Sequence, residues 1–123
     1  MKTTVKAAPP NMLVLIGDRS GDISETMADR LVAATSSCVA VGTQYSYDGE
    51  TSITVSDEPA DLKDGSLAFD GVLLASSRTV FICTVFDEVL LEMSVPTNQT
   101  RVQIWTNHPS EPDAIAVVAL AVQ

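Results

Sequence analysis

The stretch Glu88–Trp105, EVLLEMSVPTNQTRVQIW, contains the two clearest strand patterns in the chain, separated by a turn at Pro96–Thr100. Apolar side chains recur at every second position of its first half: Val89, Leu91, Met93 and Val95. Residues 101–107 alternate again, with Val102 and Ile104 on one face. Side chains two positions apart lie on the same face of a strand, so the stretch predicts two strands, each with one apolar face.

The rest of the chain shows further short apolar or alternating runs bounded by turn residues. They predict strands at 12–16, 38–42, 51–56, 66–74, 79–86 and 115–122. Run 79–86 is apolar on both faces, as expected of a central, covered strand. Many short strands with turn signals between them predict a mainly all-β fold, a two-sheet antiparallel β-sandwich.

Residues 22–35 carry a helical pattern near the N-terminus. Asp22 and Glu25 form a capping-box-like start, and Ile23, Met27 and Leu31 follow at helical spacing. The sequence therefore predicts one short helix packed on the sheets. Gln44–Gly49 is expected to form a hairpin with its turn at Asp48-Gly49.

Length and composition indicate a single domain of 123 residues, 46% hydrophobic, with residues 1–11 as a tail and 12–123 as the sandwich. The apolar run Met12–Ile16 is too short for a signal peptide or a membrane span, so a cytoplasmic protein is expected. Cys38 and Cys83 lie in apolar runs, where thiols usually pack as small hydrophobes. A disulfide between them is left open at this point.

The charge balance restricts the partners. Sixteen acidic and seven basic residues give a formal net charge of −9. Such a surface repels nucleic-acid phosphates and anionic membranes, and it accelerates encounter with a basic protein. The alternative is an acidic surface that serves solubility alone.

Two features are candidate partner contacts. Residues 57–65 form a polar loop that could be an acidic rim facing a partner, a hard-cation site or a solvated loop. Its acidic residues are Asp57, Glu58, Asp61 and Asp64. Trp105 falls on the face opposite Val102 and Ile104, where it is either a contact anchor or packed under another layer.

Residues able to carry out chemistry are scarce. His108 is the only histidine and lies near Glu111 and Asp113, a weak candidate for metal binding or base catalysis because the spacing matches no known ligand pattern. A solvated loop is the other interpretation. The Gly-x-Ser-x-Gly motif is absent, and Cys83 is placed in mid-strand. We expect no catalytic residues, no cofactor and no enzyme activity.

Several segments resemble one known family. They are SETMADRLVAAT at 24–35, VAVGT at 39–43, RTVFI at 78–82, EVLLEMSVP at 88–96 and TRVQIW at 100–105. In order and type these segments resemble the competence protein J family, over roughly residues 12–122. The resemblance implies a two-sheet β-sandwich that acts in the cytosol as an inhibitor of a DNA-entry nuclease, with no catalytic residues.

The sequence thus predicts an acidic protein-binding module, an inhibitor or immunity-type partner of a basic nuclease or toxin. An acidic surface could occupy a basic DNA channel by charge complementarity. The alternatives are a β-module that binds carbohydrate or another small ligand, and a metal-assisted hydrolase built on His108, Glu111 and Asp113. An exposed strand edge could also pair with a second copy to make a homodimer.

Overall fold

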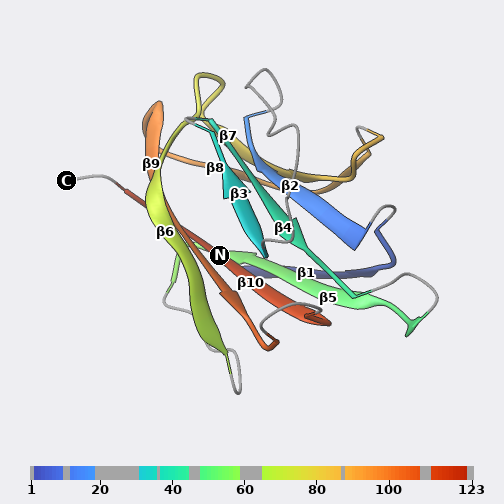
Figure 1. Cartoon of the computed structure of the whole chain (residues 1–123). Coiled ribbons are helices and arrows are strands. Elements are labelled where there is room, and N and C mark those ends of the chain that lie inside the picture. Colours follow the sequence, from blue (N-terminus) through green and yellow to red (C-terminus); the bar gives the residue numbers. More distant parts are fainter. Residues whose placement is uncertain are drawn as a thin grey trace.

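The computed structural model describes residues 2–9, 12–18, 31–35, 37–44, 48–58, 65–86, 88–108 and 112–121. Within these residues ten strands form two five-stranded sheets, and no helix is present (Figure 1). The predicted all-β, two-sheet fold is therefore confirmed. No described helix is long and apolar enough to span a membrane.

Each sheet has its own strand order. Sheet A runs, in order, β1 (Lys2–Ala7), β5 (Thr51–Ser56), β10 (Ala114–Ala121), β9 (Gln99–Thr106) and β6 (Ser66–Leu74). Sheet B runs β3 (Val32–Ala34), β4 (Cys38–Gly42), β2 (Leu13–Gly17), β7 (Thr79–Cys83) and β8 (Val89–Ser94).

The expected purely antiparallel pairing needs one correction. β5 and β10 are parallel, with Ile53 opposite Ile115, whereas the other paired strands are antiparallel. β10 lies between β5 and β9, parallel to β5 and antiparallel to β9.

The core lies between the two sheets, where the period-2 alternation of the strands points their aliphatic side chains inward. The twelve largest side chains with relative exposures below 2% are Ile16, Ile53, Leu73, Ile82, Ile104, Ile115, Val14, Val39, Val41, Val55, Val80 and Val102. Complete burial of one such side chain stabilises a fold by about 1.5–3 kcal/mol. The core therefore consists of branched aliphatic residues from both sheets.

The segment predicted as a tail contributes to sheet A. Residues 2–7 form β1, which pairs with β5 from Lys2 opposite Ser56 to Ala7 opposite Thr51. The Thr4 and Thr54 hydroxyls also hydrogen-bond across this pair at 2.8 Å. Main-chain pairing with β5 holds this strand, so it does not need an alternation of apolar side chains. Its mostly polar sequence therefore gave no strand signal.

The predicted helix over 22–35 lies largely outside the described residues. The last residues of the predicted helix, Val32–Ala34, form strand β3 instead, which pairs with β4 and has Ala33 opposite Ala40. The turn that follows is closed by Thr35, whose N–H donates to the Cys38 carbonyl at 2.8 Å. A strand pairing therefore replaces the last turn of the expected helix.

Two other local predictions need correction. The expected hairpin at Gln44–Gly49 is absent, because β4 belongs to sheet B and β5 to sheet A. The run 79–86 ends as a strand at Cys83, because the Thr84 hydroxyl accepts the N–H groups of Phe86 and Glu88, each at 3.3 Å. These bonds turn the chain into β8.

The loops gather at two ends of the sandwich. End I comprises the described loop residues 8–9, 12, 31, 43–44, 48–50, 65, 84–86, 88, 107–108 and 112–113. End II comprises residues 18, 35, 37, 57–58, 75–78 and 95–98.

Asp18 ties three loops together at end II. It is only 7% exposed, and its carboxylate accepts the Ser76 hydroxyl at 2.7 Å and the Ser77 N–H at 3.4 Å. The Asp18 N–H donates to the Ser37 carbonyl at 3.1 Å. Such a buried carboxylate is tolerated because donors surround it, and here it joins β2 to two sequence-distant turns.

Candidate protein interface

The predicted acidic loop is described only in part. Asp57 and Glu58 follow β5 directly at end II and are exposed, and the Glu58 N–H donates to the Ser56 hydroxyl at 3.0 Å. Asp61 and Asp64 lie outside the described residues. Two basic residues share this end: Lys2 is opposite Ser56, and Arg78 is exposed in the β6–β7 turn.

End I carries a second set of acidic residues, of which the sequence singled out only Asp113, as a candidate metal ligand. Four exposed carboxylates lie on three of its loops: Asp48, Glu50, Glu88 and Asp113. None of the described residues in these loops is Lys or Arg. Sequence reasoning missed the group because its members are separated by up to 65 positions, and the signal was only the overall acid excess.

An exposed aromatic residue lies in the same loop as Glu88. Phe86 is 75% exposed at the tip of the β7–β8 turn, two residues before Glu88. The Thr84 hydrogen bonds described above fix this turn, so little conformational freedom is lost when a partner contacts the ring. Single exposed apolar side chains are common on protein surfaces, and aromatic ones are enriched where proteins contact one another.

Trp105 lies on the outer face of sheet A, between Leu67 of β6 and Ala116 of β10 in the strand register. Its side chain is half-buried, and its indole N–H is buried with no hydrogen-bond partner among the described residues. A partner could contact the exposed part of the ring. It could not accept the indole N–H without local movement.

The residues around His108 form a loop clasp. Asn107 donates its amide N–H to the Asp113 carboxylate, and its amide oxygen accepts the Asp113 and Ala114 N–H groups at 3.2 Å each. His108 is exposed, and its carbonyl accepts the Thr106 hydroxyl at 3.2 Å. Glu111 lies outside the described residues, and the described part of the chain holds no group of three His, Cys, Asp or Glu residues suited to a metal.

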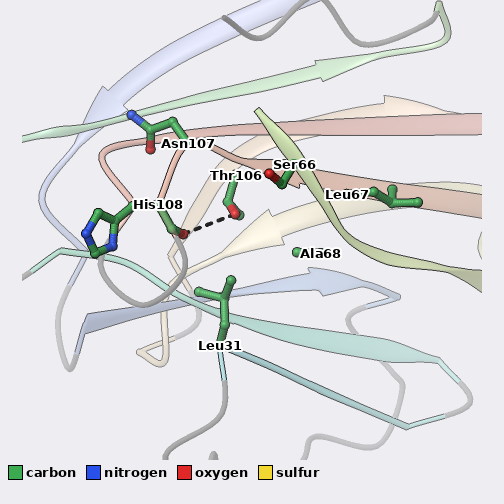
Figure 2. Close-up of a pocket in the computed structure, with 7 residues that line it drawn as sticks. All are labelled: Leu31, Ser66, Leu67, Ala68, Thr106, Asn107 and His108. Carbon is green, nitrogen blue, oxygen red and sulfur yellow. Dashed lines mark hydrogen bonds between the residues drawn. The ribbon is translucent and has the colours of Figure 1, made fainter. Parts of the chain in front are cut away.

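A hollow of about 530 Å³ opens at end I beside this clasp. Figure 2 shows its lining, which comes from the residue before β3, the start of β6 and the end of β9. The lining residues are Leu31, Ser66, Leu67, Ala68, Thr106, Asn107 and His108. Aliphatic and hydroxyl groups dominate, and none of the described lining residues carries a carboxylate.

An ion pair balances charge on the outer face of sheet A. Arg101 of β9 donates from Nε and Nη2 to the two Asp70 oxygens of β6, at 2.9 and 2.7 Å. The hydrogen bonds from Arg101 lower the pKa of Asp70 below its ordinary value. Both side chains are partly exposed, so the pair affects local charge more than stability.

The two cysteines are buried and not disulfide-bonded. They lie on strands that flank β2 on opposite sides, Cys38 opposite Gly17 and Cys83 opposite Leu15. Two strand spacings amount to roughly 9–10 Å, beyond the Cα separation that a disulfide can span. Burial raises the pKa of Cys38 to about 11, which excludes a reactive thiolate near neutral pH.

These features define an all-β protein of two five-stranded sheets with acidic loops at one end. Two solved structures share this fold. One is ComJ from Bacillus subtilis, described as an inhibitor of the DNA degrading activity of NucA. It has a TM-score of 0.65 and 10% identity over 99% of this chain and 96% of ComJ.

The second solved structure is described as crocagin biosynthetic gene J. It has a TM-score of 0.52 and 14% identity over 95% of this chain and 94% of that chain. No protein-family model and no curated protein sequence matches the chain. At these identities the similarity is one of fold, and the ComJ-like fold expected from the sequence is confirmed.

Proposed function

We propose that this chain is a binding protein that inhibits a nuclease. The observation that carries the proposal is the full-length similarity in fold to ComJ, a nuclease inhibitor. The net charge of −9 supports it, because nucleases that bind DNA phosphates present basic surfaces.

The contact we propose is end I. It combines Asp48, Glu50, Glu88 and Asp113 with the exposed ring of Phe86. An exposed aromatic side chain two residues from Glu88, at the same end as three further carboxylates, suits a partner that presents an apolar pocket and Lys or Arg side chains. At end II, Asp57 and Glu58 lie at the same end as Lys2 and Arg78, whereas one described Lys, Lys6 of β1, lies opposite Ser52 toward end I. The local negative field is thus weakened more at end II. The acidic segment 57–64 is therefore the competing contact.

The proposed function is tested by measuring how the protein affects DNA cleavage by a nuclease. Nucleases retained from the source extract by the immobilised protein are purified and titrated with it at low salt. Loss of DNA cleavage at one inhibitor per nuclease is the expected result, with affinity falling as salt rises because long-range charge attraction is screened. Undiminished cleavage in the extract at any excess of the protein would overturn the proposal.

Two charge-matched variants locate the contact. Asp48→Asn with Glu50→Gln removes two charges just before β5, and Asp57→Asn with Glu58→Gln removes two charges just after it. We expect the first pair to slow association with the nuclease about 3- to 10-fold and the second pair to change it much less. Stopped-flow association rates measure this difference.

A third variant separates the contribution of the Phe86 ring to binding from that of the carboxylates. Phe86→Ala leaves the charge unchanged and should act mainly by accelerating dissociation, as truncated anchors do. If only the change at 57 and 58 slows association, the contact lies at end II instead. If both charge variants act equally, total charge rather than location controls encounter, and the proposed contact at end I is wrong.

A further inference from the structure

β6 forms one edge of sheet A and is nine residues long. It pairs with β9 on one side, and no described strand pairs with it on the other (Figure 1). Three aliphatic side chains of β6 are strongly exposed: Leu67 at 46%, Val72 at 52% and Leu74 at 46%. An open edge with exposed apolar residues is a template for another strand.

The register shows which main-chain groups of β6 are available. The Ala75 N–H donates to the Asn98 carbonyl at 2.8 Å, and Leu73 lies opposite Thr100. Hydrogen-bonded and non-hydrogen-bonded pairs alternate in an antiparallel ladder, so Gly71 and Leu73 bond to β9. The N–H and C=O groups of Val72 and Leu74 therefore point to the open edge.

The other three sheet edges carry features that discourage pairing. β1 has Lys2 and Lys6, β8 has Glu92 with Glu88 just before it, and β3 is only three residues long. Charged residues and short length are common protections of edge strands. The single charged residue of β6, Asp70, is neutralised by Arg101 of its own sheet.

We propose that a second copy of this chain pairs with β6, antiparallel, to form a symmetric dimer. Each copy carries a charge of −9, so two copies can meet closely only where the local charge is balanced, as it is around Asp70 and Arg101. A basic partner is instead attracted to the acidic loops of end I. The neutral apolar edge therefore suits an identical chain.

Side-chain matching selects the register of the dimer. When Val72 of one copy lies opposite Leu74 of the other, the two-fold axis passes beside Leu73 and four aliphatic side chains meet on one face. The edge-facing main-chain groups of Val72 and Leu74 then pair with each other. This arrangement also places Asp70 beyond the apolar pairs, away from its own symmetry mate.

The oligomeric state tests the proposal, by sedimentation equilibrium over a range of protein concentrations. We expect a dimer for the wild type and at least a tenfold weaker one for Val72→Lys, which places like charges at the axis. Val89→Lys is the matched control, since Val89 is an exposed valine on the edge strand of the other sheet and should leave the dimer unchanged.

Val72→Pro is a second variant that removes only an edge-facing N–H, a change that edge strands accommodate. It too should weaken the dimer, while circular dichroism shows that the fold is kept. Disulfide cross-linking then tests the register. A mixture of Val72→Cys and Leu74→Cys proteins should cross-link faster than either variant alone, because facing residues have Cα atoms within disulfide range.

Three results would overturn the proposal. The first is a wild type that stays monomeric at millimolar concentration. The second is a dimer that Val72→Lys leaves intact. The third is hydrogen-exchange protection of Val72 and Leu74 that appears only when a nuclease is bound, which would assign this edge to the nuclease. The first two results do not depend on whether the chain inhibits a nuclease.

Discussion

Cys38 provides a pH-dependent test of burial at the scale of one residue. Its pKa rises from the ordinary 9.0 to about 11 in the folded protein because burial disfavours the thiolate. When the pKa of a group is higher in the folded protein than in the unfolded chain, the group makes its full contribution to the unfolding free energy at pH values below the unfolded pKa. That contribution is lost as the pH rises through the folded value. The contribution of Cys38 should therefore disappear between about pH 9 and pH 11.

The measurement compares the wild type with Cys38→Ala by urea unfolding at several pH values. The difference in unfolding free energy between the two proteins should be constant up to about pH 9 and shift against the wild type above it. This comparison cancels the titration of lysines and tyrosines, which both proteins share. A difference that stays constant up to pH 11 would contradict the assignment.

Asp18 marks a limit of sequence reasoning about single residues. The sequence placed it in a loop after an apolar run, which is where it lies. Its burial depends on Ser76 and Ser77, 58 and 59 positions away, which supply its hydrogen bonds. Trp105 is similar, since its outward face followed from alternation but the burial of its indole N–H did not.

At the scale of elements, Gly17 determines how closely β2 approaches β4. Its φ is +146°, and a methyl group at this position would overlap the Ser37 carbonyl oxygen. Gly17→Ala should therefore lower the unfolding free energy by about 2–4 kcal/mol, through backbone strain and overpacking together. Urea unfolding monitored by circular dichroism measures the loss.

Gly49→Ala is the matched control for this prediction. Gly49 also has a positive φ, +126°, but the nearest atom to an added methyl group is Gln44 Nε2, at an ordinary 3.7 Å. We expect a loss of only about 1 kcal/mol there, from the backbone conformation alone. Equal losses in the two variants would show that the close approach of β2 and β4 contributes nothing.

Apolar runs and alternation predicted the bounds of three strands well. The predicted ranges 38–42, 51–56 and 66–74 agree with β4, β5 and β6 in the structure. β1 was missed because a polar strand at a sheet edge has no apolar period, and β3 because three residues cannot show one. Strand order was not predictable, since pairing depends on contacts between residues far apart in sequence. The edge position of β6 could therefore be found only in the structure.

At the scale of the whole molecule, the charge of −9 opposes compactness. Repulsion among the acidic side chains is screened by salt, so the melting temperature should rise between about 0.02 M and 0.5 M sodium chloride. Melting followed by circular dichroism checks this. The double variant Asp48→Asn with Glu50→Gln has a charge of −9 + 2 = −7 and should show a smaller rise.

A melting temperature that falls with added salt would mean that attractive pairs such as Asp70 and Arg101 outweigh the repulsion.

The acid excess could be counted from the sequence, and it predicted a basic partner. The gathering of Asp48, Glu88 and Asp113 at end I could not be predicted, because the fold brings three separate loops to that end. The candidate interface is thus a property of topology.

The position of β10 also constrains how the protein is made. β10 is the last of the ten described strands in the sequence, yet it lies at the centre of sheet A between β5 and β9. During synthesis, β5 and β9 leave the ribosome without the strand that joins them, so sheet A cannot assemble until residue 121 has emerged. Until then Ile53, Val55, Val102 and Ile104 lack their neighbours in β10, and exposed apolar surface of this kind is what chaperones bind.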